Sequence, residues 1–225
     1  MLVLRTLLPA IAIAGIGLGF GQDGTAPGIS LPAPAVIKGA PFAAQAVTES
    51  IQTLADGNRV VRKMVSSIAR DAEGRTRQEK TGVAGAPAVV IIHDPVAGAA
   101  YMLDGKSRSA MRLPVAEPES GVRPGAPAIG SEPLGDLMVE GLLAHGSRLT
   151  RSIPAGQAGN EREVQIVFEA WYSDELQTVL LTRTQDPRFG ETTYKLTEIQ
   201  RGEQPKSLFE VPQAYRVVDT EGRKR

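Results

Sequence analysis

His93 and His145 are the two histidines of the chain, so a metal site or a catalytic base would have to use them. His93 precedes Asp94 at the end of an apolar run, and His145 stands two residues before Ser147. Neither histidine has metal-ligand spacing such as H-x-x-x-H, and Ser147 lacks the G-x-S-x-G elbow of serine hydrolases. We therefore predict no metal and no catalytic residue. A hydrolase built from Ser147, His93 and Asp94 is the alternative.

Pairs of neighbouring carboxylates are the next candidates for chemistry. Glycosidase chemistry needs two carboxyl groups that face each other across a cleft, whereas each pair here lies in or beside a predicted turn. The pairs are Glu117 and Glu119, Glu161 and Glu163, and Asp174 and Glu175. The glycines form neither a P-loop nor a dinucleotide-binding fingerprint, and the chain has no cysteine for a thiolate site or a disulfide. The residues predict no cofactor and no enzyme.

Length and composition allow one sheet-rich domain with an aliphatic core. The chain has 225 residues, of which 42% are hydrophobic and 4% aromatic. It has 25 basic and 25 acidic residues, so its net charge is zero. A neutral chain argues against a nucleic-acid partner, because such a partner normally needs a broad basic field.

A local basic cluster nevertheless lies on two predicted strands. Alternation places Arg59 and Lys63 on one face of the first strand and Arg62 and Arg70 on the other, so they form no single stripe. The cluster consists of Arg59, Arg62, Lys63, Arg70, Arg75, Arg77 and Lys80. We interpret it as a solvated outer surface, with an anionic partner as the alternative.

The N-terminal segment predicts export. Residues 1–21 contain one charge, Arg5, and then an uncharged run that is shorter than the roughly 20 apolar residues of a membrane span. The small-x-small triplet at 19–21 suits cleavage before Gln22. We expect a periplasmic protein with a cleaved signal peptide and no stable membrane span; a retained N-terminal anchor is the alternative. Residues 22–42, rich in Gly, Pro and Ala, predict a flexible leader.

Turn signals divide the rest of the chain into about ten strands. Asp56-Gly57, Glu73-Gly74 and the 105–107 turn predict hairpins, and two further strands meet near Gly141. Residues 114–133 hold five prolines and three glycines, which predicts a long flexible loop. The fold class is mainly β: a single curved antiparallel sheet or unclosed barrel with few short helices.

The clearest period of two covers 164–172. Ile166, Phe168 and Tyr172 alternate with polar residues, and the next strand carries Val179 and Leu181. These five residues are the predicted wall of a ligand cavity. Trp171, the single tryptophan, is expected to fill the core, with the mouth of a cavity as the alternative.

The stretch GETTYKLTEI (190–199) predicts the strand that closes the sheet. Alternation places Tyr194 and Leu196 on one side and Ile199 with Lys195 on the other. The turn that follows, PKSLFEVP, is expected to deliver Phe209 and Val211 to seal one end of the sheet.

Four stretches together resemble a known group: TLADGNRVVRK, VVIIHDPVAGAAYMLD, EAWYS, and GETTYKLTEIQRGEQPKSLFEVPQAYRV. They are similar to uncharacterised exported bacterial proteins with a lipoprotein-localisation-factor-like (LolA/LolB-like) fold. The resemblance covers residues 43–218 and leaves 219–225 as a charged tail. It implies an unclosed antiparallel barrel whose apolar concave face can hold acyl chains.

The expected function is therefore binding. We expect a lipid or acyl chain as the partner, held by Ile166, Phe168, Tyr172, Val179 and Leu181. The alternative is an envelope module that meets a protein through an exposed sheet edge or the basic hairpin.

Overall fold

The computed structural model describes residues 36–80, 88–113, 115 and 130–219. The predicted signal peptide (1–21) lies outside these ranges, and so do most of the leader (22–42), most of the loop (114–133) and all but Asp219 of the tail. Within the described ranges, no helix is both long enough and apolar enough to cross a membrane.

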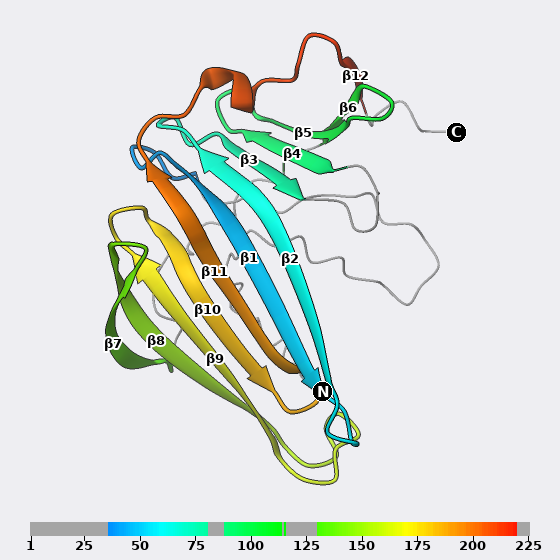
Figure 1. Cartoon of the computed structure of the whole chain (residues 1–225), viewed down its shortest axis with the longest axis vertical. Coiled ribbons are helices and arrows are strands. Elements are labelled where there is room, and N and C mark those ends of the chain that lie inside the picture. The colour runs from blue at the N-terminus through cyan, green and yellow to red at the C-terminus, as the bar shows by residue number, and fades with distance from the viewer. Residues whose placement is uncertain (1–35, 81–87, 114, 116–129, 220–225) are drawn as a thin grey trace, which may run out of the picture.

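Twelve strands form one continuous sheet in the order β12-β6-β5-β4-β3-β2-β1-β11-β10-β9-β8-β7 (Figure 1). The sheet is mainly antiparallel, as predicted, and β12 is a strand that the sequence analysis did not foresee. The strands are β1 (Phe42–Thr53), β2 (Arg59–Arg70), β3 (Thr76–Lys80), β4 (Val89–Asp94), β5 (Ala99–Asp104), β6 (Ser109–Leu113), β7 (Glu132–Val139), β8 (Leu142–Ile153), β9 (Val164–Ser173), β10 (Thr178–Asp186), β11 (Gly190–Arg201) and β12 (Arg216–Asp219).

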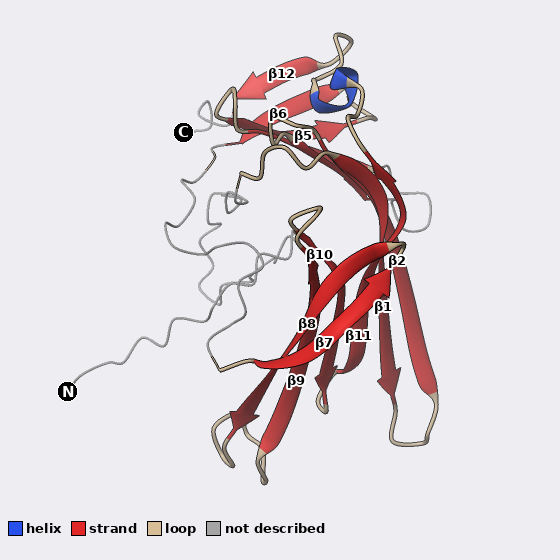
Figure 2. Cartoon of the chain, turned by 90° about the vertical axis from the view of Figure 1, so that its left-hand side faces the viewer, coloured by secondary structure: helices blue, strands red, loops and turns tan. Residues whose placement is uncertain are grey.

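The sheet bends, and its two faces are distinguished by the C-terminal segment. Figure 2 shows the single helix of the described residues, the 3-10 helix η2 (Lys206–Phe209), on the outer side of the bend. Val211 and Tyr215, just beyond it, pack against Ile92 and Leu103. Neighbouring side chains of a strand point to opposite faces, so Ile91 and Met102 point to the concave side.

The predicted hairpins are confirmed. β1 pairs antiparallel with β2, and β2 with β3. In the first turn the Asn58 N–H donates to the carboxylate of Asp56, and Gly57 takes a φ of 83°, which glycine adopts without a Cβ clash. β5 and β6 also pair as a hairpin, and β7 meets β8 through the turn at Glu140 and Gly141.

β11 lies inside the sheet, where it pairs with both β10 and β1, so the prediction that it closes the sheet is wrong. A second detail is also wrong: Ile199 packs against the same cluster as Tyr194 and Leu196. The pairing with β1 shifts between Ala43 and Gln45, opposite a residue of β11 with a φ of 53°, Glu198. Such a bulge inserts one residue and so reverses the alternation beyond it.

Three apolar clusters form the core. The largest gathers buried residues from β1 and β7–β11, and Trp171 belongs to it, as expected. The second lies on the concave side of β4–β6 around Ile91 and Leu113. The third lies on the convex side, where the C-terminal segment covers β4–β6. Val211 packs on this third cluster and Phe209 is buried, so the segment covers the convex face of the sheet and not the predicted end of it.

Two predicted boundaries differ from the structure. β1 begins at Phe42, the last residue of the predicted leader, and β7 begins at Glu132, inside the predicted loop. Phe42 is buried in the largest cluster, so side-chain burial extends the strand beyond the point where the Gly/Pro-rich composition ends.

Candidate ligand-binding surface

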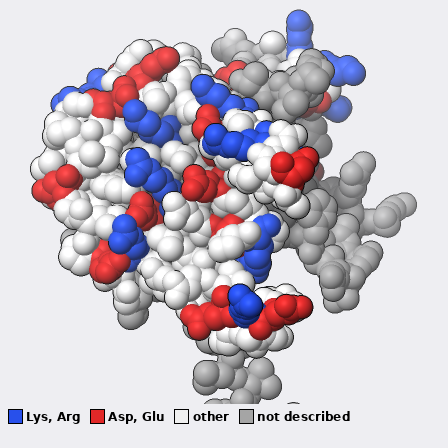
Figure 3. Space-filling view, turned by 60° about the horizontal axis from the view of Figure 1, so that its bottom comes forward, with Lys and Arg blue, Asp and Glu red and all other residues white. Residues whose placement is uncertain are grey.

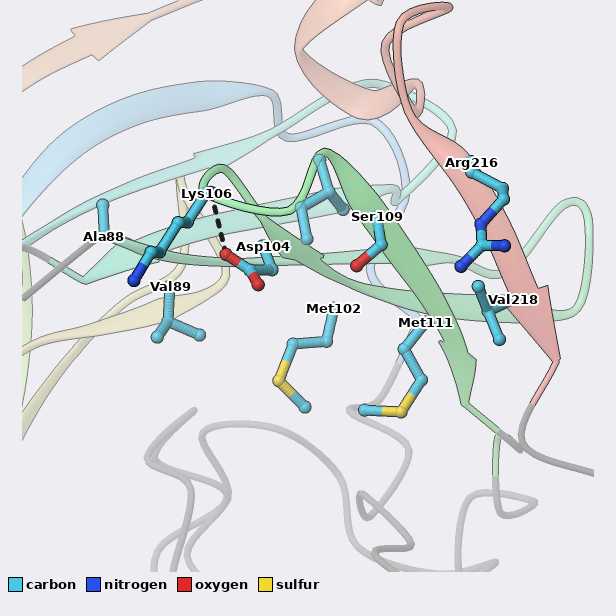
Figure 4. A pocket seen from close by; sticks show the side chains of 10 residues that line it. Ala88, Val89, Met102, Asp104, Lys106, Ser109, Met111, Arg216 and Val218 are labelled. Carbon is cyan, nitrogen blue, oxygen red and sulfur yellow. Dashed lines mark hydrogen bonds between the residues drawn. The ribbon is translucent and has the colours of Figure 1, made fainter. Parts of the chain in front are cut away.

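A hollow lies on β4, β5, β6 and β12. Its volume is about 470 Å³, within the range of about 300 to 1,000 Å³ that small-molecule sites occupy. Its lining residues are Ala88, Val89, Met102, Leu103, Asp104, Lys106, Ser109, Met111, Arg216 and Val218. Figure 4 shows Met102 and Met111 side by side, with the polar groups of Lys106, Asp104, Ser109 and Arg216 displaced to one edge.

Strand register explains this separation of polar and apolar groups. Residues that are directly opposite in neighbouring strands point to the same face, so the concave side of this region is built from cross-strand rows. From the β5–β6 turn inward the rows are Arg216-Ser109-Asp104-Val89, then Val218-Met111-Met102-Ile91, then Leu113-Ala100-His93. Polarity therefore falls along the strands, from a charged row to a thioether row to a buried row.

The C-terminal segment supplies one side of the hollow. Phe209 is buried on the convex face, and Tyr215 packs on the cluster around Leu103. The Arg216 N–H then donates to the carbonyl of Arg108 at 2.9 Å, which begins β12 as a parallel neighbour of β6. The LFEVP stretch thus anchors the chain on one face so that Arg216 and Val218 can line the other.

The charged edge of the hollow carries one acid and two bases. The Lys106 N–H and the Ser107 hydroxyl both donate to the Asp104 carboxylate, at 2.8 and 2.7 Å. The Ser107 hydroxyl bond, followed by the Lys106 backbone bond, lowers the pKa of Asp104, so this side chain is an anion held within its own turn. None of the ion pairs among the described residues involves Lys106 or Arg216.

The predicted cavity wall lies on the other half of the sheet. Ile166, Phe168 and Tyr172 of β9 share one face, and Val179 of β10 lies directly opposite Tyr172 on that face; all four are half-buried. Register followed across the sheet shows that this is the concave face.

Leu181, the fifth predicted residue, lies elsewhere. It pairs with Trp171 because a bulge shifts the register between Val179 and Leu181. The side chain of Leu181 therefore points away from the concave face and is buried in the core. The structure brings four of the five predicted residues together and leaves Leu181 out.

The alternative hydrolase site is not assembled among the described residues. His93 lies on β4 and Ser147 on β8, with six strands between them in the sheet order. Asp94 points to the opposite face from His93, and its carboxylate accepts the N–H groups of Val96 and Ala97 in the turn. Its hydrogen bonds thus stabilise the hairpin.

The two histidines have opposite surroundings. His93 is buried and its Nε2 has no hydrogen-bond partner among the described residues, so burial lowers its pKa. His145 is exposed, and its Nδ1 lies 2.7 Å from Asp136 while its Nε2 lies 3.3 Å from Asp174. The hydrogen bond to Asp136, the charge of Asp136 and then Asp174 raise the pKa of His145.

The predicted carboxylate pairs that the structure describes bind separate partners. Glu163 accepts the Ser152 hydroxyl, and Glu175 pairs with Arg201 at 3.0 Å. Asp174 pairs with His145. Glu117 and Glu119 lie outside the described residues.

One further group of carboxylates has a metal-like arrangement. Asp71, Glu73 and Glu203 each offer an oxygen within 4.8 Å of the others. However, Arg75 pairs with Asp71 at 2.5 Å and with Glu73 at 3.3 Å, so a cation of the protein itself already occupies this cluster.

The prediction of a solvated basic surface is wrong for Arg70. This side chain is 5% exposed and donates to the carbonyls of Ala40 and Leu176. Burial lowers the pKa of Arg70 to about 10. Arg59, Arg62 and Lys63 are exposed, as expected. Figure 3 shows acidic and basic side chains interspersed over the face in view, as the zero net charge suggests.

Sequence reasoning missed the hollow itself. The alternation of Met102 with Leu103 and of Met111 with Ala110 was visible in the predicted hairpin. What it did not show was that Arg216 and Val218 return to this hairpin from more than 100 positions away, as a parallel strand.

Comparisons with known proteins show similarity of fold. No family model matches the chain, and no curated protein matches it. The chain is similar to the solved structure of an uncharacterized conserved protein from Thermus thermophilus, at 11% identity and a TM-score of 0.48, over 80% of this chain and 90% of that one.

Two further structures have similar folds. One is the MucA/MucB complex of Pseudomonas aeruginosa, at 14% identity and a TM-score of 0.46, over 80% of this chain but 58% of that one. The other is the LolA superfamily protein NE2245 from Nitrosomonas europaea, at 8% identity and a TM-score of 0.36, over 76% of this chain and 90% of that one. These similarities concern the backbone fold alone.

Proposed function

We propose that the protein is a non-enzymatic binding protein that holds a lipid-like ligand on the concave face of its sheet. The observation that carries this proposal is the hollow beside β12, where Val89, Met102, Met111 and Val218 offer an apolar surface. Methionine suits such a surface because its flexible thioether adapts to ligands of different shape.

Ligand burial alone can supply the affinity. Each methylene removed from water contributes about 0.8 kcal/mol, so a single acyl chain can bind without a catalytic or metal-ligating group. Ile166, Phe168, Tyr172 and Val179 are proposed to extend the same concave surface for the distal part of a long chain. Leu181 is left out of this surface because it points into the core.

Native mass spectrometry of gently purified protein tests the proposal. We expect co-purifying lipid, and uptake of a fluorescent fatty acid by protein from which that lipid has been removed. Replacement Met111→Gln should weaken uptake about tenfold, since burying a methionine is worth about 1.5–3 kcal/mol. The matched control is Met64→Gln, because Met64 lies on the same face outside the hollow and is 61% exposed. Protein that carries no lipid and takes up no probe would exclude the function.

Export to the periplasm is part of the proposal and rests on residues 1–21. N-terminal sequencing of the protein recovered from a periplasmic fraction should begin at Gln22. A start at Met1 in the membrane fraction would instead indicate the retained anchor.

One observation favours a second candidate, an envelope module that binds a protein segment. β3 pairs with β2 only from Ser66 onward. Along the preceding part of β2, Val61, Met64 and Val65 are exposed beside Arg62 and Lys63. An extended acidic segment of a partner could add to this edge as a further strand.

Crosslinking in the periplasm tests this second candidate. Charge reversal at Arg62 and Lys63 should abolish capture, whereas Arg70 is unsuitable for the test because it is buried. Reversal of Arg151, an exposed arginine on β8, is the control. Capture that survives reversal at Arg62 and Lys63 would rule out this edge.

A further inference from the structure

The hollow on β4, β5, β6 and β12 has two chemically different ends, and this difference narrows the class of ligand. Its inner rows consist of Val218, Met111, Met102 and Ile91, backed by the buried Leu113 and Ala100. Its outer row ends in Arg216, with Lys106 in the adjoining turn. A ligand that fills both ends must be apolar along most of its length and polar at one end.

Charge decides the sign of that polar end. The outer row contains Asp104 and Arg216, and Lys106 lies in the adjoining turn, so this edge carries two cations and one anion. Asp104 is engaged by the Lys106 N–H and the Ser107 hydroxyl, both within its own turn. The two basic side chains make no ion pair with a described residue, which leaves a net positive edge.

Arg216 is the better placed of the two cations. Its backbone is fixed by the hydrogen bond to the Arg108 carbonyl and by pairing with Ser109, so its guanidinium starts from a defined position. In Figure 4 this guanidinium points across the hollow towards Ser109, directly above Val218. A guanidinium offers paired N–H donors that match the two oxygens of a carboxylate or phosphate group.

We infer that the hollow binds a single-chain amphiphile with an anionic head group, whose head lies against Arg216 and whose chain lies over Met111 and Met102. The inference rests on the proposed function and names its ligand class. A carboxylate head and a phosphate head share the chemistry that Arg216 recognises, and the experiment distinguishes them.

The experiment measures the affinities of three ligands with the same twelve-carbon chain by calorimetry, below their micelle concentrations. The ligands are dodecanoate, dodecyl phosphate and the neutral dodecanol. Each is titrated into the full chain and into Arg216→Gln, Lys106→Gln and the control Arg62→Gln. Arg62 is an exposed arginine on the same concave face, outside the hollow.

We expect at least one anionic ligand to bind about tenfold more tightly than dodecanol, as a charge-assisted hydrogen bond allows. Arg216→Gln should remove this preference and leave the affinity for dodecanol unchanged. Lys106→Gln should reduce the preference less, because Lys106 lies at the other end of the hollow from Arg216 (Figure 4). Arg62→Gln should behave as the parent protein. The anion that shows the larger loss on Arg216→Gln identifies the head group.

Two results would overturn the inference, and they differ in what they mean for the proposed function. Equal affinities for all three ligands, or a preference that survives Arg216→Gln, would exclude recognition of an anionic head group but would still be consistent with an apolar binding site. Failure of all three ligands to bind would remove both. Equal melting temperatures of the parent and Arg216→Gln proteins would show that a lost preference is not a folding defect.

Discussion

The two halves of the sheet pack their apolar side chains differently. On the half built from β1 and β7–β11, apolar side chains fill one large cluster that includes Leu180 and Leu196, both with no exposed surface. On the half built from β3–β6 and β12, the convex side is covered by the C-terminal segment, and the concave side retains a hollow.

This difference in packing explains why one half of the sheet can leave apolar side chains accessible to a ligand. A cluster that is packed from the chain's own residues stabilises the fold, so the other half can leave Met102 and Met111 half-exposed. The C-terminal segment compensates there by burying Phe209 and by packing the half-buried Tyr215 against the back of the same strands.

Removal of the Phe209 side chain tests the support behind the hollow. Phe209 is 2% exposed, and Phe→Ala in a core costs about 3–5 kcal/mol. We expect Phe209→Ala to lower the free energy of unfolding by about this amount in urea titrations, with early loss of amide protection in β12. Val217→Ala is the control, because Val217 lies in β12 itself and is 50% exposed. Full protection of β12 in Phe209→Ala would show that the segment is held by other contacts.

Truncation of Leu196 tests the packed half. Leu196 lies on β11 opposite Ala46 and is fully buried, so Leu196→Ala should cost about 2–5 kcal/mol in the same titrations. Ligand binding at the hollow should persist at temperatures where the variant is folded. Leu143→Ala, at a position 49% exposed on β8, should change stability by less than about 0.5 kcal/mol. Equal losses from both variants would contradict the packed core assigned to this half.

The two halves of the sheet also differ in how much of their structure could be predicted from the sequence. Local signals were sufficient for the hairpins, because the turn at Asp56-Gly57 and the alternation through Phe168 depend on neighbouring residues. Two bulges were not visible, and each reversed a side-chain direction: Ile199 turned into the core, and Leu181 turned away from the concave face. A bulge depends on the partner strand, which the sequence of one strand does not specify.

The candidate site was less predictable than the fold. Its outer row combines Ser109 of β6 with Arg216 of β12, and only the parallel pairing of these strands brings the two together. The anchoring residues Phe209 and Val211 were predicted from the LFEVP stretch. These residues position Arg216 at the edge of the hollow only because the chain after Tyr215 pairs with β6. No local sequence pattern predicts that pairing.

Arg70 tests whether the packed half depends on a buried cation. Its guanidinium donates to the Ala40 and Leu176 carbonyls and lies 4.9 Å from the centre of the Phe42 ring. Arg70→Ala leaves two carbonyls without these donors, so we expect a loss of about 1–3 kcal/mol in thermal or urea unfolding. Arg62→Ala, on the same face of β2 but exposed, should be close to neutral. Equal stability of Arg70→Ala and the parent would mean that the cost of burying the cation offsets its hydrogen bonds.

The smallest expected effect concerns the two histidines, His93 on one half of the sheet and His145 on the other. In a pH titration followed by NMR, the pKa of His145 should lie above the usual 6.5 and that of His93 below it. The hydrogen bond to Asp136 favours the charged form of His145, so its contribution to stability is complete below pH 6.5 and is lost as the pH rises through its folded-state pKa. Burial favours neutral His93, so stability is lost as the pH falls from 6.5 through the lowered pKa of that residue.

Single replacements assign these two signals and their effects on stability. Asp136→Asn should return the pKa of His145 towards 6.5 and leave His93 unchanged, because the two residues lie on different strands and share no hydrogen bond. His145→Gln should remove the loss of stability that accompanies a rise of pH above 6.5, measured as the melting temperature relative to the parent protein. His93→Gln should remove the loss below pH 6.5. If both histidines titrate at 6.5 in the folded protein, the contrast between an open hairpin and a buried strand fails at these positions.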